Sequence, residues 1–243
     1  MGESIMKRLI IFATGNKDKI REICEIITDP ETQVISMKEA EVAADPEEDG
    51  TTFEENALIK ARSFAELVQK AASAKTGVFA GLDPETELLV MSDDSGLVID
   101  ALDGAPGIYS ARYMGHETSY ILKMNHILDL MKDVPDEKRS ARFVAAVVAV
   151  VLGPCSAMTG NSSESNCNSE GIRFPMELVV RGTMEGAIGH SIAGEHGFGY
   201  DPFFLLPELG VTSAELTDDQ KNAISHRGNA MRSMLKELES RGL

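Results

Sequence analysis

Two adjacent acids, Asp93 and Asp94, follow the short apolar run of residues 88–91 and precede Ser95. Adjacent aspartates repel each other and are poor strand formers, so their place at the expected end of a buried strand needs an explanation. Ligands collect beyond the carboxyl ends of strands in parallel sheets. Two carboxylates there suit a hard divalent cation such as Mg²⁺, or a general base for water. The alternative is a structural Asx turn.

A glycine turn, TGNKDK at residues 14–19, lies between an expected strand and an expected helix. Such a turn presents backbone N–H groups and a positive helix end to an anion. Lys17 and Lys19 add charge, while Thr14 and Asn16 can hydrogen-bond phosphate oxygens. The turn lacks the GxxxxGK[ST] pattern of a P-loop. An ordinary turn with surface lysines is the alternative.

Two further clusters lie in loops. The acidic stretch DPEEDG, residues 45–50, is either solvated or supplies a second metal ligand. The glycine-rich stretch GEHGFGYDPFF, residues 194–204, contains Phe198, Tyr200 and Asp201. Glycine-flanked aromatics on a loop can hold a flat ring, and a neighbouring acid can bind its edge. The alternative is a glycine-rich turn whose aromatic side chains enter the core.

A last cluster, DQKNAISHRGNA at residues 219–230, places Lys221, Ser225, His226 and Arg227 at a helix junction. These side chains are donors for a base edge or a phosphate, and a helix cap with exposed charges is the alternative. Taken together, the clusters describe a site for a purine nucleoside triphosphate. They supply a phosphate turn, an acid pair for metal, an aromatic loop for the base and terminal donors.

Hydrophobic periodicity predicts the elements that position these clusters. A strand, a tight glycine turn and a helix open the chain, which is the first unit of an α/β protein. We expect strands at residues 8–13, 33–37, 141–152 and 177–188, a loop or hairpin leading into a strand at 75–90, and helices at 19–29, 119–132, 216–224 and 226–239.

Another helix is expected to begin near Phe53, because Thr52 and Glu55 have the spacing of a capping box. Its predicted polar stripe contains Asn56 and Lys60, four residues apart. Its predicted apolar face consists of Ala57, Leu58, Ala61, Ala65 and Leu67.

Composition limits the possible partners and locations. The chain has 243 residues and a formal net charge of -16, which argues against a nucleic-acid partner. No apolar run approaches the 18 residues of a membrane span, and the apolar stretch near the N-terminus is too short for a signal-peptide core. We therefore expect a cytoplasmic protein. It should form a single domain over residues 1–243, with a surface insertion without chemistry at 153–171.

Five segments occur in the order seen in the inosine triphosphate pyrophosphatase family, the non-canonical purine NTP pyrophosphatases. They are FATGNKDK, FEENALIKA, DDSGLVIDALDGAPGIYSARY, GFGYDPFF and KNAISHRGNA. The chain resembles this family from about residue 8 to residue 238. The resemblance implies an α/β fold with an elongated mixed β-sheet flanked by helices, in two lobes with the active-site cleft between them. It also implies a Mg²⁺-dependent cytoplasmic homodimer that hydrolyses ITP, dITP and XTP to the monophosphate and pyrophosphate.

The same resemblance assigns roles to particular residues. Glu47 and Asp94 match the metal ligands, and Asp94 also matches the proton acceptor. The substrate-binding positions are the triphosphate turn (Thr14, Gly15, Asn16, Lys17, Asp18 and Lys19), a helix lysine facing the phosphates (Lys60), a contact at Ser95, the base loop (Phe198, Gly199, Tyr200 and Asp201) and the closing contacts (Lys221, His226 and Arg227).

Two other functions compete with this one. The related septum-inhibitor-like family cleaves pyrimidine triphosphates, but the SHR motif at residues 225–227 and the GFGYDP loop count against it. A nucleotide-binding regulator without hydrolytic activity would need the metal acids to be lost. Glu47, Asp93 and Asp94 are all present. Hydrolysis of non-canonical purine triphosphates is therefore the favoured hypothesis.

Overall fold

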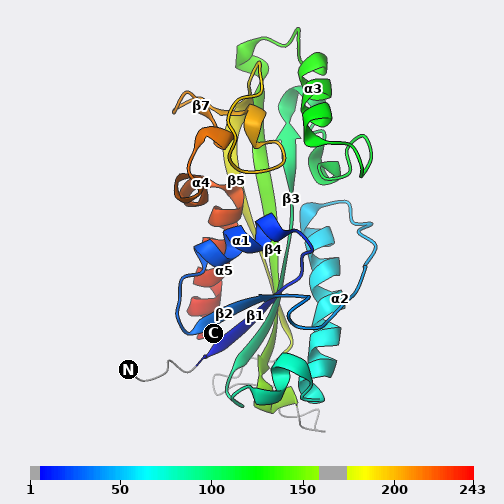
Figure 1. The fold of residues 1–243 in the computed structure, drawn as a ribbon, viewed down its shortest axis with the longest axis vertical. Helices are drawn as coiled ribbons and strands as arrows, with labels where there is room; N and C mark the ends of the chain where they lie inside the picture. Colours follow the sequence, from blue (N-terminus) through cyan, green and yellow to red (C-terminus); the bar gives the residue numbers. More distant parts are fainter. Residues whose placement is uncertain (1–5, 159–173) are drawn as a thin grey trace. The chain divides into compact units, whose positions relative to one another are not determined.

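The structure is a computed structural model that describes residues 6–158 and 174–243. Its helices are α1 (Lys17–Ile26), α2 (Phe53–Ser73), α3 (Tyr120–Leu130), α4 (Asp218–Ile224) and α5 (His226–Ser240). Its strands are β1 (Arg8–Phe12), β2 (Thr32–Ser36), β3 (Glu87–Ile99), β4 (Ser140–Pro154), β5 (Met176–Ile188), β6 (Phe204–Leu206) and β7 (Val211–Thr212), as Figure 1 shows.

The strands are hydrogen-bonded in the order β2-β1-β3-β4-β5-β6-β7. Because β1 pairs parallel to β2 and β3 while β5, β6 and β7 pair antiparallel, the sheet is mixed, and the predicted α/β class is confirmed. The chain forms two compact units. Unit 1 comprises Met1–Asp93, Val147–Val180 and Arg232–Leu243, and unit 2 comprises Asp94–Ala146 and Arg181–Met231.

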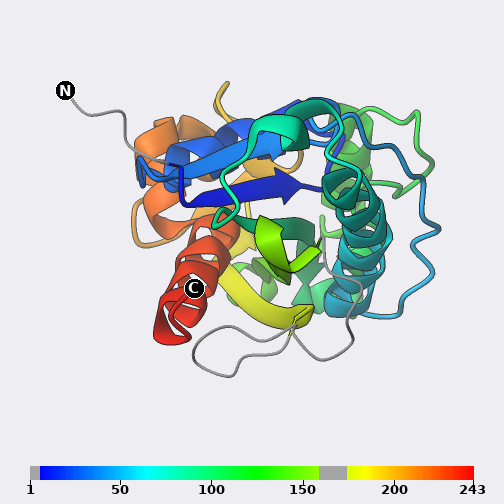
Figure 2. The same ribbon diagram turned by 90° about the horizontal axis from the view of Figure 1, so that it is seen from below.

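Unit 1 is built around β1, whose register places Ile10 opposite Val34 of β2 and Leu89 of β3. A strand paired on both sides in parallel is covered on both faces and needs apolar residues throughout, and Ile10 is fully buried. Helix α2 is tied to β3 by Ser92, whose Oγ donates a 2.5 Å hydrogen bond to the carbonyl oxygen of Ala57. Figure 2 shows β1 in dark blue and α2 in cyan. These contacts hold the part of β3 that leads to Asp93.

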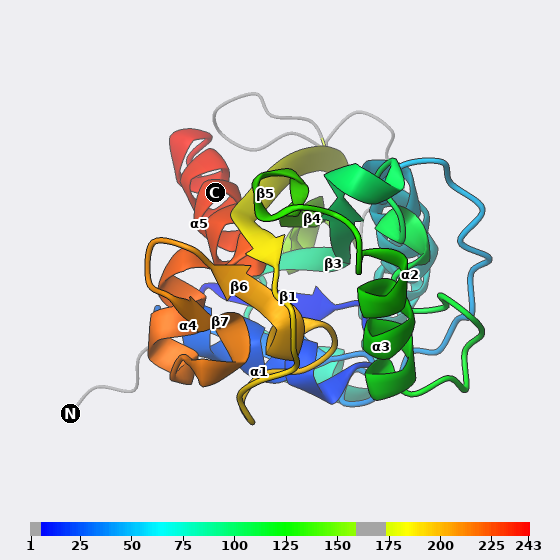
Figure 3. The same cartoon turned by 90° about the horizontal axis from the view of Figure 1, so that it is seen from above.

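Unit 2 has a core of its own, to which helix α3 contributes Met124 and Ile127 and its C-cap contributes Met131. They cluster with buried residues of β3 to β6, among them Leu97 and Phe204. Strand β6 continues the sheet from β5, with Ala187 opposite Leu205, and β7 pairs with β6. Figure 3 shows α3 in green and the β6–β7 segment in orange. These two strands have only three and two residues, too few for a periodic pattern to predict them.

The acid pair lies within a strand and not at its end, so that expectation was wrong. Strand β3 runs for 13 residues through Asp93 and Asp94 to Ile99. The apolar runs before and after the acids pack in units 1 and 2 respectively, and the backbone between them stays extended. Because side chains alternate along a strand, the two carboxylates point to opposite faces.

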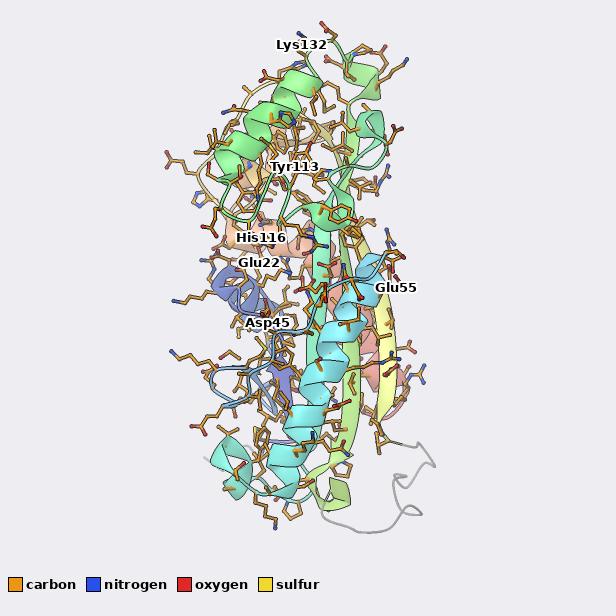
Figure 4. All side chains as sticks on the ribbon, turned by 90° about the vertical axis from the view of Figure 1, so that its right-hand side faces the viewer. Glu22, Asp45, Glu55, Tyr113, His116 and Lys132 are labelled. Carbon is orange, nitrogen blue, oxygen red and sulfur yellow. The ribbon has the colours of Figure 1, made fainter. Side chains whose placement is uncertain are left out.

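Helix α2 begins at Phe53 as predicted, and the Thr52 side chain accepts from the backbone N–H of Glu55. The second hydrogen bond of the capping box is shifted by one residue, because the Glu55 carboxylate accepts from the N–H and hydroxyl of Thr51 and not from Thr52. Figure 4 labels Glu55 at the start of this helix. The predicted polar stripe was wrong at Asn56, which is fully buried. The buried face also differs from the prediction. Phe64 and Val68 are buried, whereas Leu58 and Leu67 are half-buried.

Two other expectations concern the ends of segments. Helix α1 begins at Lys17, two residues before the predicted start, because Asn16 caps it. The expected insertion at 153–171 lies largely outside the described residues. Its first two residues end β4, and Cys155–Met158 form a short 3-10 helix.

In the part of the chain that is described, no helix combines the length and apolar character needed to cross a membrane.

Candidate functional site

The predicted phosphate turn forms the entry to helix α1 in unit 1. The Asn16 side-chain oxygen accepts from the backbone N–H groups of Asp18 and Lys19, at 2.9 and 3.4 Å, and Thr14 Oγ1 accepts from Asn16 N at 3.2 Å. Asn16 therefore acts first as a helix cap, and its amide NH₂ group is the part suited to an anion. A Cβ at Gly15 would meet no atom within 4 Å. The space beside Gly15 is thus open, as close approach of a phosphate requires.

Lys19 of this turn is joined to the first acid of the pair. Its Nζ lies 2.9 Å from Asp93 Oδ1, and the Asp93 side chain has no exposed surface while that of Lys19 is 15% exposed. A buried carboxylate is tolerated when a cation and hydrogen bonds satisfy it. The ion pair therefore compensates the buried negative charge of Asp93, and it holds the Lys19 ammonium beside β3.

The acidic loop and helix α2 form a second ion pair in unit 1. Lys60 Nζ lies 3.1 Å from Glu48 Oε2, with the side chains 15% and 31% exposed. Glu47, the predicted metal ligand, is exposed. The loop is closed onto α2 by the buried Asn56, whose side-chain oxygen accepts from Gly50 N at 2.9 Å. Asn56 thus fixes the position of the loop and is not part of an exposed stripe.

Asp94 and Ser95 belong to unit 2. Asp94 is 9% exposed, and its Oδ1 accepts from the backbone N–H of Ser95 at 3.0 Å. Ser95 Oγ accepts from Arg227 Nη2 at 3.1 Å. The structure therefore brings together three predicted site residues, Asp94, Ser95 and Arg227, although 132 positions separate the last two.

Asp201 is the centre of a second group in unit 2. Its Oδ2 accepts from the backbone N–H of Phe198 and from Lys221 Nζ, both at 2.8 Å, and its Oδ1 accepts from Ser213 Oγ at 2.8 Å. The side chains of Asp201 and Lys221 are only 4% and 5% exposed. This carboxylate is satisfied inside the chain, so its direct effect is to hold the base loop and the Lys221 ammonium in place.

The two aromatic residues of the base loop have different environments. Phe198 is half-buried, and its ring centroid lies 5.0 Å from Lys221 Nζ and 5.6 Å from Arg227 Cζ. Tyr200 is buried, its hydroxyl donates to the Ser110 carbonyl at 3.0 Å, and burial raises its pKa. Tyr200 therefore belongs to the core, as the alternative for this loop supposed, while Phe198 is half-buried beside two cations.

The junction before α5 is a capped helix start and also a donor cluster. Ser225 Oγ accepts from Gly228 N at 3.0 Å, which is the hydrogen bond of an N-cap. His226 is 6% exposed, and its ring stacks on Phe143 with centroids 4.9 Å apart and planes 18° apart. Arg227 is 1% exposed. The charges are therefore buried and not on an exposed cap, contrary to the alternative considered for this segment.

Sequence reasoning did not identify the partners of these residues. These partners are set by contacts between separate segments of the chain. They are Glu48 for Lys60, Asp93 for Lys19, and Ser213, which donates a hydrogen bond to Asp201. Ser213 lies in no recognisable motif. Only the charge of Glu48, next to Glu47 in the acidic loop, was a signal that the sequence could supply.

Comparison with known proteins decides the family. A family model described as the Ham1 family matches residues 10–237. The chain belongs to the Ham1 family. It is 39% identical over 231 residues to the dITP/XTP pyrophosphatase of Photorhabdus laumondii, covering 95% of this chain and 98% of that protein. The corresponding protein of Escherichia coli K12 is 37% identical over 231 residues, with the same coverage.

The fold agrees with this assignment. The Ham1 protein of Staphylococcus aureus superposes on this Ham1-family chain with a TM-score of 0.70 at 34% identity, covering 96% of this chain and 99% of that one. The family resemblance inferred from the five sequence segments is therefore confirmed.

Proposed function

We propose that the protein hydrolyses ITP, dITP and XTP to the nucleoside monophosphate and pyrophosphate, which removes these non-canonical purines from the nucleotide pool. The observation that carries the proposal is its similarity, over nearly the whole chain, to proteins named dITP/XTP pyrophosphatases. The grouping of Asp94, Ser95 and Arg227 in unit 2 supports it further.

Glu47 and Asp94 are the proposed ligands of a divalent metal, Mg²⁺. Carboxylate oxygens are the ligands this ion prefers; Glu47 is exposed and Asp94 is 9% exposed. Within residues 6–158 and 174–243 no group of three or more His, Cys, Asp or Glu side chains forms a complete site. Mg²⁺ usually takes one or two carboxylates together with substrate phosphates and water. When bound, the ion neutralises phosphate charge and lowers the pKa of water.

Asp94 is the proposed proton acceptor. As a carboxylate it orients and deprotonates a water molecule, whose oxygen forms a bond to the α-phosphorus while the bond from that phosphorus to the bridging oxygen breaks. The leaving group is pyrophosphate, whose charge Lys17, Lys19 and Lys60 stabilise. An ammonium has three N–H donors, so Lys19 can keep Asp93 as a partner while it donates to a phosphate.

The nucleobase is proposed to bind at the base loop and the start of α5. Phe198 stacks on the ring, and His226 and Arg227 donate to the 6-oxo oxygen of hypoxanthine or xanthine. Adenine has an amino group at that position, which cannot accept these hydrogen bonds. Asp201 and Lys221 hold the loop, as their buried ion pair indicates. Guanine shares the 6-oxo group, so its rejection requires a contact near the 2-amino group.

The remaining expectations are part of the same proposal. The enzyme acts in the cytoplasm as a homodimer and has no nucleic-acid or membrane partner. The net charge of -16 supports the exclusion of nucleic acid.

The proposal is tested by pyrophosphate release from a panel of nucleoside triphosphates with Mg²⁺. ITP, dITP and XTP should be cleaved, and ATP should be refused. Hydrolysis of ITP in ¹⁸O-water should label IMP and leave pyrophosphate unlabelled, because water attacks the α-phosphorus. Release of IDP and orthophosphate would instead identify a phosphatase.

A further inference from the structure

Lys123, on the first turns of helix α3, is a buried cation that none of the five sequence segments includes. It is 1% exposed, and its Nζ donates a 2.6 Å hydrogen bond to the Ala111 carbonyl oxygen. In the part of the chain that is described, no carboxylate forms an ion pair with it. Its other neighbour is the ring of Tyr120, whose centroid lies 4.8 Å from Nζ. Burial lowers the pKa of Lys123, as expected for an ammonium removed from water.

The hydrogen bond of Lys123 is one of a pair on consecutive carbonyls. Tyr200 of the base loop donates from its hydroxyl to the Ser110 carbonyl at 3.0 Å. Ser110 also uses its side chain, since its Oγ accepts from Leu97 N at 2.9 Å and donates to the Gly107 carbonyl at 2.6 Å. The backbone at Ser110 and Ala111 is therefore held by β3, by α3 and by the base loop at once. Figure 4 labels Tyr113, two residues further on, near α3.

The first turns of α3 also contact the base loop directly. The rings of Tyr120 and Tyr200 meet edge to face, with centroids 5.1 Å apart and planes at 89°. A Cβ at Gly199 would lie 3.6 Å from Tyr120 Cε1, and Gly199 has a φ of +69°. Tyr120 thus packs behind the part of the loop that follows Phe198. Lys123, over the face of the Tyr120 ring, adds a cation–π contact to this packing.

We propose that Lys123 is a positioning residue for nucleobase binding. It ties the Ala111 carbonyl to α3 and supports Tyr120 against Tyr200, so that the loop presents Phe198 in one orientation. An isolated buried ammonium is costly unless its hydrogen bonds are satisfied, and here a carbonyl and an aromatic face satisfy it at the back of the loop. The inference rests on the proposed function, because it takes the base loop as the site of the nucleobase.

The test compares K123M with K132M, which removes an exposed lysine just beyond the end of α3. Binding of IMP and of inorganic pyrophosphate is measured by calorimetry, and KM and kcat for ITP are measured alongside. We expect K123M to weaken IMP binding and raise KM by about tenfold, the effect of losing one charge-assisted hydrogen bond. Pyrophosphate binding should stay unchanged and kcat should stay within about twofold. K132M should match the parent, and K123R should recover part of the loss because it restores a charged donor.

Equal IMP binding by K123M and the parent would overturn the inference. So would a parallel loss of IMP and pyrophosphate binding, because that is the result of general unfolding. If K123M does not fold, Y200F removes the companion hydrogen bond, and unchanged IMP binding in Y200F would refute the role. A parent protein that binds IMP but releases no pyrophosphate from ITP would refute the proposed function alone, since IMP binding still tests Lys123.

Discussion

The ion pairs Lys60–Glu48 of unit 1 and Asp201–Lys221 of unit 2 differ in burial. In unit 1, Lys17 and Glu47 are exposed, and Lys60 keeps 15% of its side chain exposed in its ion pair with Glu48. In unit 2, Asp201 and Lys221 are almost completely buried in their ion pair. A buried charge must have its partners in place before the chain is stable. The Asp201–Lys221 pair is therefore fixed in place without a ligand, whereas Lys17, Glu47 and Lys60 keep exposed surface.

Breaking the buried ion pair should have a much larger effect on stability than breaking the partly exposed one. D201A removes one partner of the buried ion pair and leaves the Lys221 ammonium without its carboxylate. The free energy of unfolding should fall by about 3–5 kcal/mol. The matched variant in unit 1, E48A, breaks the partly exposed pair with Lys60 and should cost at most about 1 kcal/mol. Urea denaturation of both variants measures the difference. Equal losses would mean that the two pairs do not differ as their burial suggests.

The second prediction concerns a loss of catalytic activity at nearly unchanged stability. D94N keeps the shape of the side chain but removes its charge, and turnover of ITP should fall by at least roughly 100-fold, because general base catalysis is lost. The free energy of unfolding should change little. D45N, on the exposed acidic loop labelled in Figure 4, is the control and should keep the parent rate. Turnover of D94N within about threefold of the parent at saturating Mg²⁺ would remove Asp94 from the mechanism.

The third and smallest prediction concerns base selectivity. R227A removes a buried guanidinium that contacts Ser95, and the ratio of kcat/KM for ITP over ATP should fall by about tenfold or more, since a hydrogen bond to a charged group is lost. R241A, which removes an exposed arginine near the C-terminus, should leave the ratio unchanged. Steady-state kinetics with both substrates measures it. A decrease by the same factor for ITP and ATP would make Arg227 a phosphate or structural residue.

The elements with strong local signals could be predicted from the sequence. Helix α4 lies within the predicted range 216–224 and has a capping box of Thr217 and Gln220, and α3 begins after Ser119 as its periodicity indicates. The continuous apolar run of β4 predicted a buried strand, and it is one. In each case neighbouring residues decide the structure, through a cap or a period.

The features that could not be predicted depend on distant contacts. Asn56 looks like a surface residue on a helical pattern, but it is buried because the acidic loop closes over it through Gly50. Asp93 looked like a strand end, but Lys19 compensates its charge and the strand continues. Residue types and spacing indicated the phosphate turn, the acid pair and the aromatic loop, and the family resemblance assigned roles to single residues such as Glu47 and Asp94. Which of them are buried and paired was visible only in the structure.

The division of the chain into units has a consequence for synthesis on the ribosome. Unit 1 draws on Arg232–Leu243 as well as on the first 93 residues. Met234 and Leu238, both fully buried, lie in that last segment. Strands β1 and β2 and helix α2 therefore remain incompletely packed until nearly all of the chain has been translated. Premature termination after Met231 would leave every residue of unit 2 in place and still deprive unit 1 of part of its core, so the truncated product should be a substrate for proteolysis.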